Sequence, residues 1–431
     1  MPFTLVELNE VNFDYVKGYL SMGEDLPTFR KLIQGGVVET TSEAEYDHLE
    51  PWIQWPSVHT GKTFSEHQIF RLGDIVKVDE HQIFEVAESH GFSVGVVCAM
   101  NSRSRLRDPS YFIPDPWTAT SAHGGWLLKK IAAALRQSVN DNSEGKIAIQ
   151  SIFTLAVGTL LHVSPRYWLK LISYALKSRG KSWRKALFLD LWLFFLNETL
   201  AVRRKVDFSV VFLNAGAHIQ HHFFLNSALA PQQKNPSWYI NEKEDPLLEM
   251  LHVYDFLLGY LGLNNRDYLI ATGLSQTPYE APLIYYRLKH HSDFLTALGV
   301  NFLDVTPRMT RDFLISCDSF EDAILAEQLL KNVSTPDGRN LFGIVDNRGV
   351  DVFVTLTFCD ELDDSAVVIV DGRSLFLKDH FVFVAIKNGE HASRGFALGS
   401  TRFRRFLPNQ GAHVAKLYES MCSYLKFYSK V

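Results

Sequence analysis

Two acidic side chains stand at or near the end of the first apolar run of the chain. Phe3 to Leu8 is a short apolar stretch that contains Glu7, and the polar residues Asn9 and Glu10 follow it directly. This pattern is typical of a buried strand, and open α/β sheets place their sites at the carboxyl ends of such strands. A carboxylate in that position can act as a general base or as a nucleophile. We therefore predict catalytic roles for Asn9 and Glu10.

Histidines further along the chain offer metal ligands. His218 and His221 are spaced as His-x-x-His within Asn214 to Asn226, and His391 lies near the C-terminal end. With a nearby carboxylate this set could hold one divalent ion, for which zinc or manganese is the expected choice. The same groups could also work with no metal, a carboxylate acting as base or nucleophile and a histidine as acid.

The stretch from Glu50 to Asp74 is rich in tryptophan, histidine and hydroxyl-bearing residues and shows no clear helical or strand period. Polar groups at this density are costly to bury unless each finds a partner, so the stretch is expected to line a site. Glu50 and His59 are the expected catalytic residues of this stretch. Trp55 and Ser57 are its expected substrate-binding residues.

Arginines follow another predicted strand, in the loop from Asn101 to Thr118. Guanidinium groups suit phosphate, sulfate or carboxylate, so Arg103 and Arg105 are candidate anion-binding residues. Arginines in a loop are more often only solvated charge, and that interpretation stays open. Gln220, which lies between the two histidines of the His-x-x-His pair, completes the expected substrate-binding set.

Apolar runs separated by helical stretches predict an α/β fold with a mostly parallel central sheet flanked by helices. Beyond the first strand, strands are expected at Phe92 to Ala99, Asp207 to Leu213, Tyr268 to Ala271, Val350 to Thr357 and Phe381 to Ile386. Helices are expected at Phe13 to Met22, Thr28 to Gln34 and within Thr306 to Leu341. No flexible linker interrupts the pattern, so residues 1–431 are expected to form one domain.

A helical insertion is expected over residues 119–205, with basic clusters at Lys129-Lys130, Lys177 to Arg184 and Arg203 to Lys205. We favour a cap packed over the sheet, with its basic faces in solvent. The alternative is a basic amphipathic surface that meets an anionic or lipid-linked substrate.

Composition and charge narrow the classes of function. The chain is 46% hydrophobic and 21% charged, as globular proteins are, and its net charge of −5 gives no general attraction to nucleic acid. Four widely separated cysteines and an N-terminus without a signal-peptide pattern favour a cytoplasmic protein. The apolar runs Ile152 to Val163 and Ala186 to Leu196 are shorter than the roughly 20 residues that span a bilayer, so no transmembrane segment is expected.

Several short motifs resemble the alkaline phosphatase superfamily, in its type I phosphodiesterase/nucleotide pyrophosphatase branch. The matching residues are Leu26-Pro27-Thr28-Phe29, then Trp55, Ser57, Thr60 and Gly61, and then Glu66, His67, Ile69 and Phe70. The resemblance implies an alkaline-phosphatase-like fold. It also implies that His391 and either His221 or His218 stand at metal-ligand positions.

The chain departs from that family at the positions where the family holds two metals and a hydroxyl nucleophile. The replacing residues are Asn9, Pro51, Ala217, Gly273 and Leu274. Two zinc ions in one site need several carboxylates to balance their charge and fill their coordination shells. The usual two-metal site is therefore not expected to form.

Three functions stay open. The first is a hydrolase or transferase that acts on a phosphate- or sulfate-linked substrate, a small molecule or glycan that could contain sugar, with at most one metal. The second is a metal-independent glycosyl hydrolase or transferase that uses Glu10 and Glu50. The third is a non-catalytic member of the superfamily that binds a ligand. The sequence leaves the oligomeric state open.

Overall fold

The computed structural model describes residues 2–140, 149–230, 233–261, 266–308, 311–364, 366–370 and 373–426. The chain divides into two compact units. Unit 1 comprises Met1–Ala230, Glu242–Pro278 and Gly389–Val431, and unit 2 comprises Pro231–Asn241 and Tyr279–Asn388. The sequence predicted a single domain over residues 1–431. That remains a prediction, alongside the division of the chain into two compact units.

Unit 1 is built on an eight-stranded sheet in the order β16-β2-β15-β6-β1-β5-β3-β4. Its strands are β1 (Phe3–Leu8), β2 (Val38–Thr41), β3 (Val94–Val97), β4 (Tyr111–Ile113), β5 (Phe208–Leu213), β6 (Asp267–Ala271), β15 (Arg394–Gly399) and β16 (Ala412–His413). Every pairing except the two made by β15 is parallel. The predicted α/β class with a mostly parallel sheet is confirmed, and so are the four strands predicted in this unit.

The three central strands β6, β1 and β5 end at the same edge of the sheet. Leu8 of β1 pairs with Leu213 of β5, and Glu7 of β1 pairs with Ala271 of β6. All residues of β1 and β5 are buried, as expected for parallel strands covered on both faces. The segments that follow the three strands therefore emerge side by side.

Helices flank this sheet, among them α1 (Phe13–Ser21), α2 (Pro27–Gln34), α3 (Pro51–Thr60), α4 (Phe64–His67), α5 (Ile83–Ser89), α10 (Ala215–Phe223), α11 (Pro246–Leu261) and α15 (Lys416–Leu425). The two helices predicted near the N-terminus are confirmed as α1 and α2. The absence of a helical period across Glu50 to Asp74 was misleading, because α3 and α4 form there. Nine of the ten residues of α3 are buried, and a helix buried on all sides has no polar face to reveal its period.

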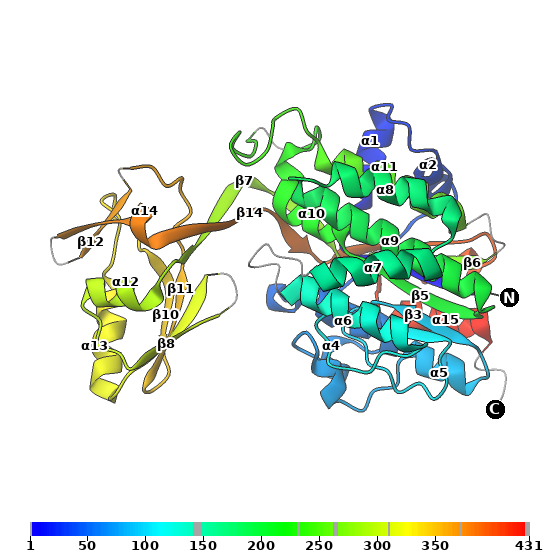
Figure 1. Cartoon of the computed structure of the whole chain (residues 1–431), viewed down its shortest axis with the longest axis horizontal. Coiled ribbons are helices and arrows are strands. Elements are labelled where there is room, and N and C mark those ends of the chain that lie inside the picture. Colours follow the sequence, from blue (N-terminus) through cyan, green and yellow to red (C-terminus); the bar gives the residue numbers. More distant parts are fainter. Residues whose placement is uncertain are drawn as a thin grey trace. The chain divides into compact units, whose positions relative to one another are not determined.

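The predicted insertion is helical in the part that the structure describes. It contains α6 (Trp126–Asn140), α7 (Ile149–His162), α8 (Trp168–Lys177) and α9 (Ser182–Arg203). The helix α9 packs on β3 and β5, and both α7 and α8 pack on α9 (Figure 1). Within the described ranges, no helix combines the length and apolar character needed to cross a membrane.

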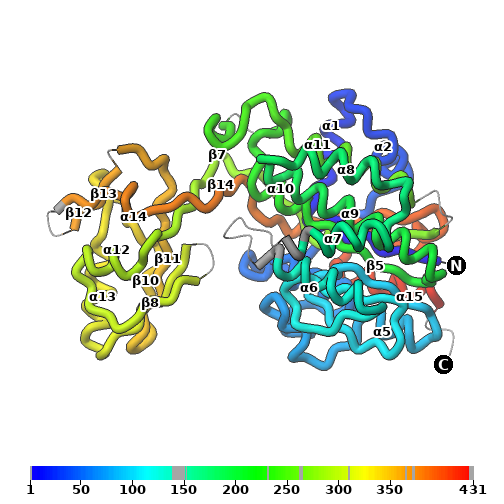
Figure 2. Tube along the Cα trace, viewed as in Figure 1, coloured from blue at the N-terminus to red at the C-terminus, as the bar shows by residue number. Residues whose placement is uncertain are grey.

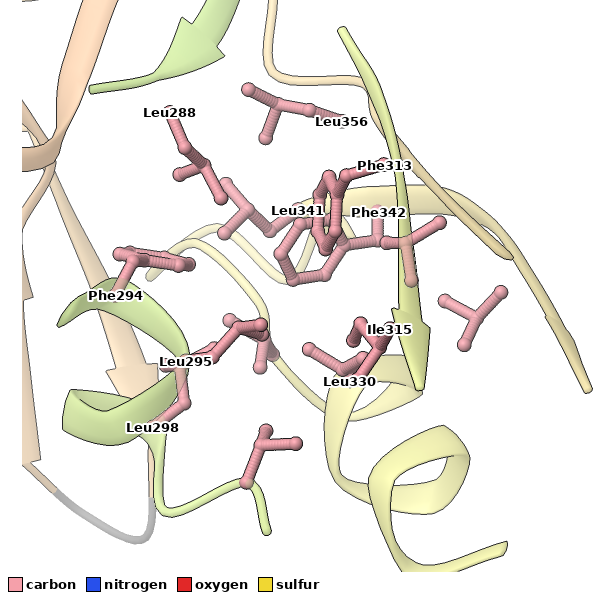
Figure 3. Close-up of a cluster of buried hydrophobic side chains, with 14 of the residues drawn as sticks. Leu288, Phe294, Leu295, Leu298, Phe313, Ile315, Leu330, Leu341, Phe342 and Leu356 are labelled. Atoms are coloured by element: carbon pink, nitrogen blue, oxygen red, sulfur yellow. The ribbon is translucent and has the colours of Figure 1, made fainter. Parts of the chain in front are cut away.

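Unit 2 has a four-stranded antiparallel sheet in the order β10-β11-β9-β8. Its elements are α12 (His291–Leu298), β8 (Asp304–Pro307), β9 (Asp312–Ser316), α13 (Phe320–Lys331), β10 (Phe342–Asn347), β11 (Asp351–Leu356), the hairpin of β12 (Val367–Val370) and β13 (Arg373–Phe376), and α14 (Leu377–His380). Phe294, Phe313 and Phe342 belong to its buried core (Figure 3). The strand predicted at Val350 to Thr357 is confirmed as β11.

The helical prediction for Thr306 to Leu341 was right for α13 and wrong at both ends. β9 alternates half-buried and buried residues, which is the period of a strand with one covered face. Two long strands, β7 (Ser275–Leu288) and β14 (Phe381–Ala392), pair with each other and carry the chain from unit 1 into unit 2 and back (Figure 2). β14 includes the strand predicted at Phe381 to Ile386.

Candidate metal centre

Glu10, His221 and His391 meet in unit 1. Glu10 follows β1, His221 lies in the last turn of α10, and His391 lies near the end of β14. The Oε2 atom of Glu10 is 3.2 Å from Nε2 of His221 and 3.2 Å from Nε2 of His391, and the two Nε2 atoms are 3.2 Å apart. Within the described part of the chain, this is the one group of His, Cys, Asp and Glu side chains placed to hold a metal ion.

The size and shape of this group fit a single ion. A tetrahedral ion with bonds of about 2.0 Å keeps its ligand atoms about 3.3 Å apart, which is close to all three sides of the observed triangle. Two imidazoles and one carboxylate suit zinc, and manganese also accepts this mixture of nitrogen and oxygen. Three protein ligands are also the usual number for a catalytic zinc site, which keeps one position open. The residues present therefore fit the predicted single metal.

The backbone holds Glu10 in an unusual conformation. Its φ of 62° lies in the left-handed region, which is rare for a residue with a side chain. Two contacts hold it there, since the N–H of Glu10 donates to the carbonyl of Thr272 at 3.0 Å and Nε2 of Gln220 donates to the carbonyl of Glu10 at 2.7 Å. The turn directs the carboxylate toward the histidines. Such local strain is often found at functional sites.

Amide side chains and imidazoles hold the Glu10 carboxylate. Nδ2 of Asn9 donates to Oε1 at 3.0 Å, and Nε2 of Gln276 makes a short hydrogen bond to Oε2. Burial by itself raises the pKa of Glu10, but the imidazoles of His391 and His221 outweigh it and hold that pKa well below its usual range. The carboxylate is therefore ionised, as a metal ligand must be.

Glu50 lies behind His391, on the side of the ring away from the triangle. It is the residue before α3, and its Oε2 is 3.6 Å from Nδ1 of His391, while Nε2 of the same ring is turned toward Glu10. A carboxylate near the outer nitrogen of a histidine attracts that edge of the ring, and such carboxylates help to orient ligand histidines in metal sites. The geometry supports a positioning role for Glu50, and its predicted catalytic role stays a prediction.

Replacing Glu50 with glutamine should weaken metal binding by about 10- to 100-fold, the usual cost of losing such a carboxylate. The measurement is the affinity for zinc in competition with a chelator. Glu45→Gln is the matched control, because this exposed carboxylate near α3 pairs only with His48 among the described ion pairs. Equal affinity in Glu50→Gln and Glu45→Gln would contradict the positioning role.

Asn9 ties three elements together at the sheet edge. Its Nδ2 also donates to Oδ1 of Asn214 at 2.8 Å, and its Oδ1 accepts a hydrogen bond from Nε1 of Trp55 at 2.8 Å. Trp55 is fully buried, so its indole N–H is already used inside the protein. The structure thus brings Asn9 to the group as a support for Glu10. A substrate-binding role for Trp55 stays a prediction.

Two glutamines and a glycine support the other side of the group. Oε1 of Gln220 accepts from the backbone N–H of Asn12 at 3.2 Å, so both ends of this predicted substrate-binding side chain are engaged. A Cβ at Gly389 would lie 2.6 Å from Oε1 of Gln276 and 2.8 Å from the carbonyl of Gln220. Only glycine allows β14 to approach this closely, and the approach delivers His391.

Three other predicted site residues have their described contacts outside the triangle. His59 pairs with Glu7 at 2.6 Å, and both side chains are fully buried. Ser57 contacts Nε2 of His67 at 3.0 Å, and burial lowers the pKa of His67 to about 4, so this histidine is neutral. The centroid of the His218 ring lies 4.9 Å from the centroid of the His222 ring. His218 is not part of the metal-ligand group. Their site roles stay predictions.

The two arginines are also engaged elsewhere. The buried guanidinium of Arg103 donates to the carbonyls of Ile75 and Glu80, at 3.1 and 2.7 Å, and to that of Val78. Arg105 pairs with the exposed carboxylate of Asp79. These contacts give Arg103 a structural role in its loop. Anion binding by either arginine stays a prediction.

The sequence reasoning missed two supporting residues. Gln276 gave no signal, because a lone glutamine after a strand is common. Asp190 interrupts the apolar run of α9, and it accepts hydrogen bonds from the N–H groups of Asn214 and Ala215, at 3.1 and 2.8 Å, and from Tyr254 at 2.6 Å. Burial raises the pKa of Asp190 to about 6. Asp190 thus caps α10, the helix that carries His221.

No family model matches the chain, and no curated protein matches it. Several solved structures are similar to it at low sequence identity. The phosphonoacetate hydrolase of Sinorhizobium meliloti 1021 gives a TM-score of 0.46 at 13% identity over 98% of this chain and 96% of that chain. Murine ectonucleotide pyrophosphatase/phosphodiesterase 5 gives 0.42 at 12% identity over 99% and 95%.

The alkaline phosphatase of the Antarctic bacterium TAB5 is similar to a comparable degree, with a TM-score of 0.41 at 9% identity over 99% of this chain and 98% of that chain. These proteins are of the superfamily that the sequence motifs resemble.

Proposed function

We propose that this chain is a hydrolase that cleaves a phosphate- or sulfate-linked ester with one divalent metal held by Glu10, His221 and His391. The observation that carries the proposal is the three-sided group of ligand atoms, each pair 3.2 Å apart. Two of its three residues, Glu10 and His221, lie in the segments that follow the parallel strands β1 and β5. Sites of α/β proteins lie at such strand ends. When bound, zinc or manganese would polarise an ester oxygen and lower the pKa of a water molecule.

The charge of the group favours an anionic substrate. Glu10 contributes one negative charge. Histidines bind a metal as neutral imidazoles, so a divalent ion held by this group would leave the site with a net positive charge. The side chains of His221 and His391 are 19% and 13% exposed, so solvent reaches the group. A positively charged site would recognise the phosphate or sulfate group of an ester, whatever alcohol is attached to it. The substrate class that we propose therefore includes esters of sugars.

The residues around the group support one metal and not two. Asn9 stands where the related family has a carboxylate ligand, and its amide is used in three hydrogen bonds inside the protein. Gly273 and Leu274 stand where the family has an Asp-His pair, and Leu274 is fully buried. Because Pro51 replaces the hydroxyl nucleophile, we propose that water attacks the ester directly and that no covalent enzyme intermediate forms.

The geometry does not favour the glycosyl-transfer alternative. Such chemistry needs one carboxyl group that stays protonated to act as an acid. Glu10 is held ionised by two imidazoles, and Glu50 faces the outer nitrogen of His391. The proposed function therefore rests on the hydrolysis of an anionic ester.

The test uses the purified full chain. We expect about one zinc or manganese per chain by elemental mass spectrometry, as for other sites with three protein ligands. We also expect hydrolysis of bis(p-nitrophenyl) phosphate, or of p-nitrophenyl sulfate, that a chelator abolishes and added metal restores. Turnover that is indifferent to the chelator would refute the metal. A ligand that binds the metal-loaded protein without being cleaved would identify a binding protein and refute the hydrolase.

A further inference from the structure

The helices of the insertion leave two apolar stripes in solvent. On α8, Leu169, Ile172 and Leu176 are 83%, 56% and 65% exposed, while Leu171 and Tyr174 of the same helix are buried. The exposed residues are spaced i, i+3 and i+7, so they share one face of the helix. The helix therefore has a second apolar face besides the one packed against the protein.

The helix α7 repeats this arrangement. Phe153 and Leu160 are 69% and 59% exposed, and Ala156 between them is exposed as well, again with the spacing i, i+3 and i+7. Both α7 and α8 pack on the same helix, α9 (Figure 1). Several exposed apolar residues on one helix face commonly mark a protein or membrane interaction site.

The charged residues of the segment that carries the stripes all have one sign. Residues 149–189, which span α7, α8 and the start of α9, contain seven Lys or Arg and no Asp or Glu, in a chain whose net charge is −5. Lys181 pairs with Glu244 and Arg184 with Glu249. Among the ion pairs of the described residues, none includes the remaining five: Arg166, Lys170, Lys177, Arg179 and Lys185.

We propose that α7 and α8 form a docking surface for an anionic lipid bilayer, with both stripes inserted at the level of the headgroups. Apolar stripes flanked by Lys and Arg are typical of helices that lie in the membrane interface, and each basic residue adds attraction to anionic lipid. A second copy of the same surface is disfavoured because its like charges would face one another. No helix of the described chain is suited to span the bilayer, so the attachment is peripheral.

The experiment is sedimentation of the full chain with vesicles of phosphatidylcholine, alone or mixed with phosphatidylglycerol. We expect binding to be at least about tenfold stronger with phosphatidylglycerol present, and the triple variant Leu169→Gln, Ile172→Gln, Leu176→Gln to lose at least about tenfold. The matched control is Ile324→Gln, Leu325→Gln, which changes two exposed apolar residues on α13 of unit 2 and should bind as the unchanged chain does.

A second variant tests the proposal even if the triple variant fails to fold. Lys177→Gln, Arg179→Gln keeps the apolar stripes and should reduce the preference for phosphatidylglycerol, with an unchanged melting temperature. The proposal is overturned if the chain does not bind the anionic vesicles, or if the triple variant binds them as well as the unchanged chain. It is equally overturned if ultracentrifugation finds a dimer that the triple variant loses, because the stripes would then be covered by a second copy.

Discussion

Replacing His221 with alanine should leave the purified protein without bound metal and without hydrolytic activity. His221 supplies one of only three ligand atoms in the group, and its Nε2 lies 3.2 Å from both of the others. Loss of a residue that only supports a ligand costs about 10- to 100-fold in metal affinity, so loss of the ligand itself should cost more than about 100-fold. The measurements are metal content after dialysis and the rate of hydrolysis of bis(p-nitrophenyl) phosphate.

The neighbouring residue on α10 provides the control. His222 is adjacent in sequence and is not part of the metal-ligand group, so His222→Ala should keep both metal and activity. If His221→Ala retained its metal, the assignment of the ligands would be wrong. If it lost the metal but kept its activity, the ligand assignment would stand and the proposed role of the metal would fall.

Replacing Glu7 with alanine should lower the free energy of unfolding by about 3–5 kcal/mol, the usual cost of breaking a buried ion pair from one side. Oε1 of Glu7 lies 2.6 Å from Nε2 of His59, and neither side chain is exposed to solvent. The other polar atoms of the pair, Oε2 of Glu7 and Nδ1 of His59, have no hydrogen-bond partner among the described residues. His59 would thus lose its hydrogen-bond partner. Urea denaturation measures the change.

The double variant Glu7→Leu, His59→Leu separates the pair from the packing around it. Replacing both members of a buried pair with apolar side chains of similar volume is often neutral or stabilising, so this variant should recover most of the lost stability. A double variant that is less stable than Glu7→Ala would show that the pair itself holds β1 against α3. That result would contradict the idea that Glu7→Ala is unstable because His59 is left buried without its partner.

The position of Glu10 at the end of a strand could be predicted from the sequence, because a buried strand is recognised from its own run of apolar residues. The apolar run Phe3–Leu8 is long enough to be a buried strand, and the polar residues after it had to lie at the end of that strand. His221 and His391 were named as ligands, and they do reach Glu10. Their meeting depends on the register of β1 and β5 and on the approach of β14, neither of which the sequence pattern contains.

The remaining parts depend on contacts between distant segments. Glu50 was assigned to catalysis because it stands in a stretch dense in polar residues, but its relation to His391 depends on how α3 sits beside β14. Gln276 and Asp190 act only through partners far away in the chain, Glu10 and the start of α10. The helix α3 was missed because it is buried on all sides, and β8 and β9 were missed because an apparent helical period extended over them.

The three side chains proposed as metal ligands come from the beginning, the middle and near the end of the chain, at residues 10, 221 and 391. During synthesis the N-terminal part of a protein leaves the ribosome first and begins to fold before the rest. Glu10 and His221 can therefore assemble on β1 and β5 long before β14 exists. The third ligand arrives only after all of unit 2 has been made. On the proposed function, metal capture would be a late event in the life of the nascent chain, and a product truncated before residue 391 would lack one of the three side chains.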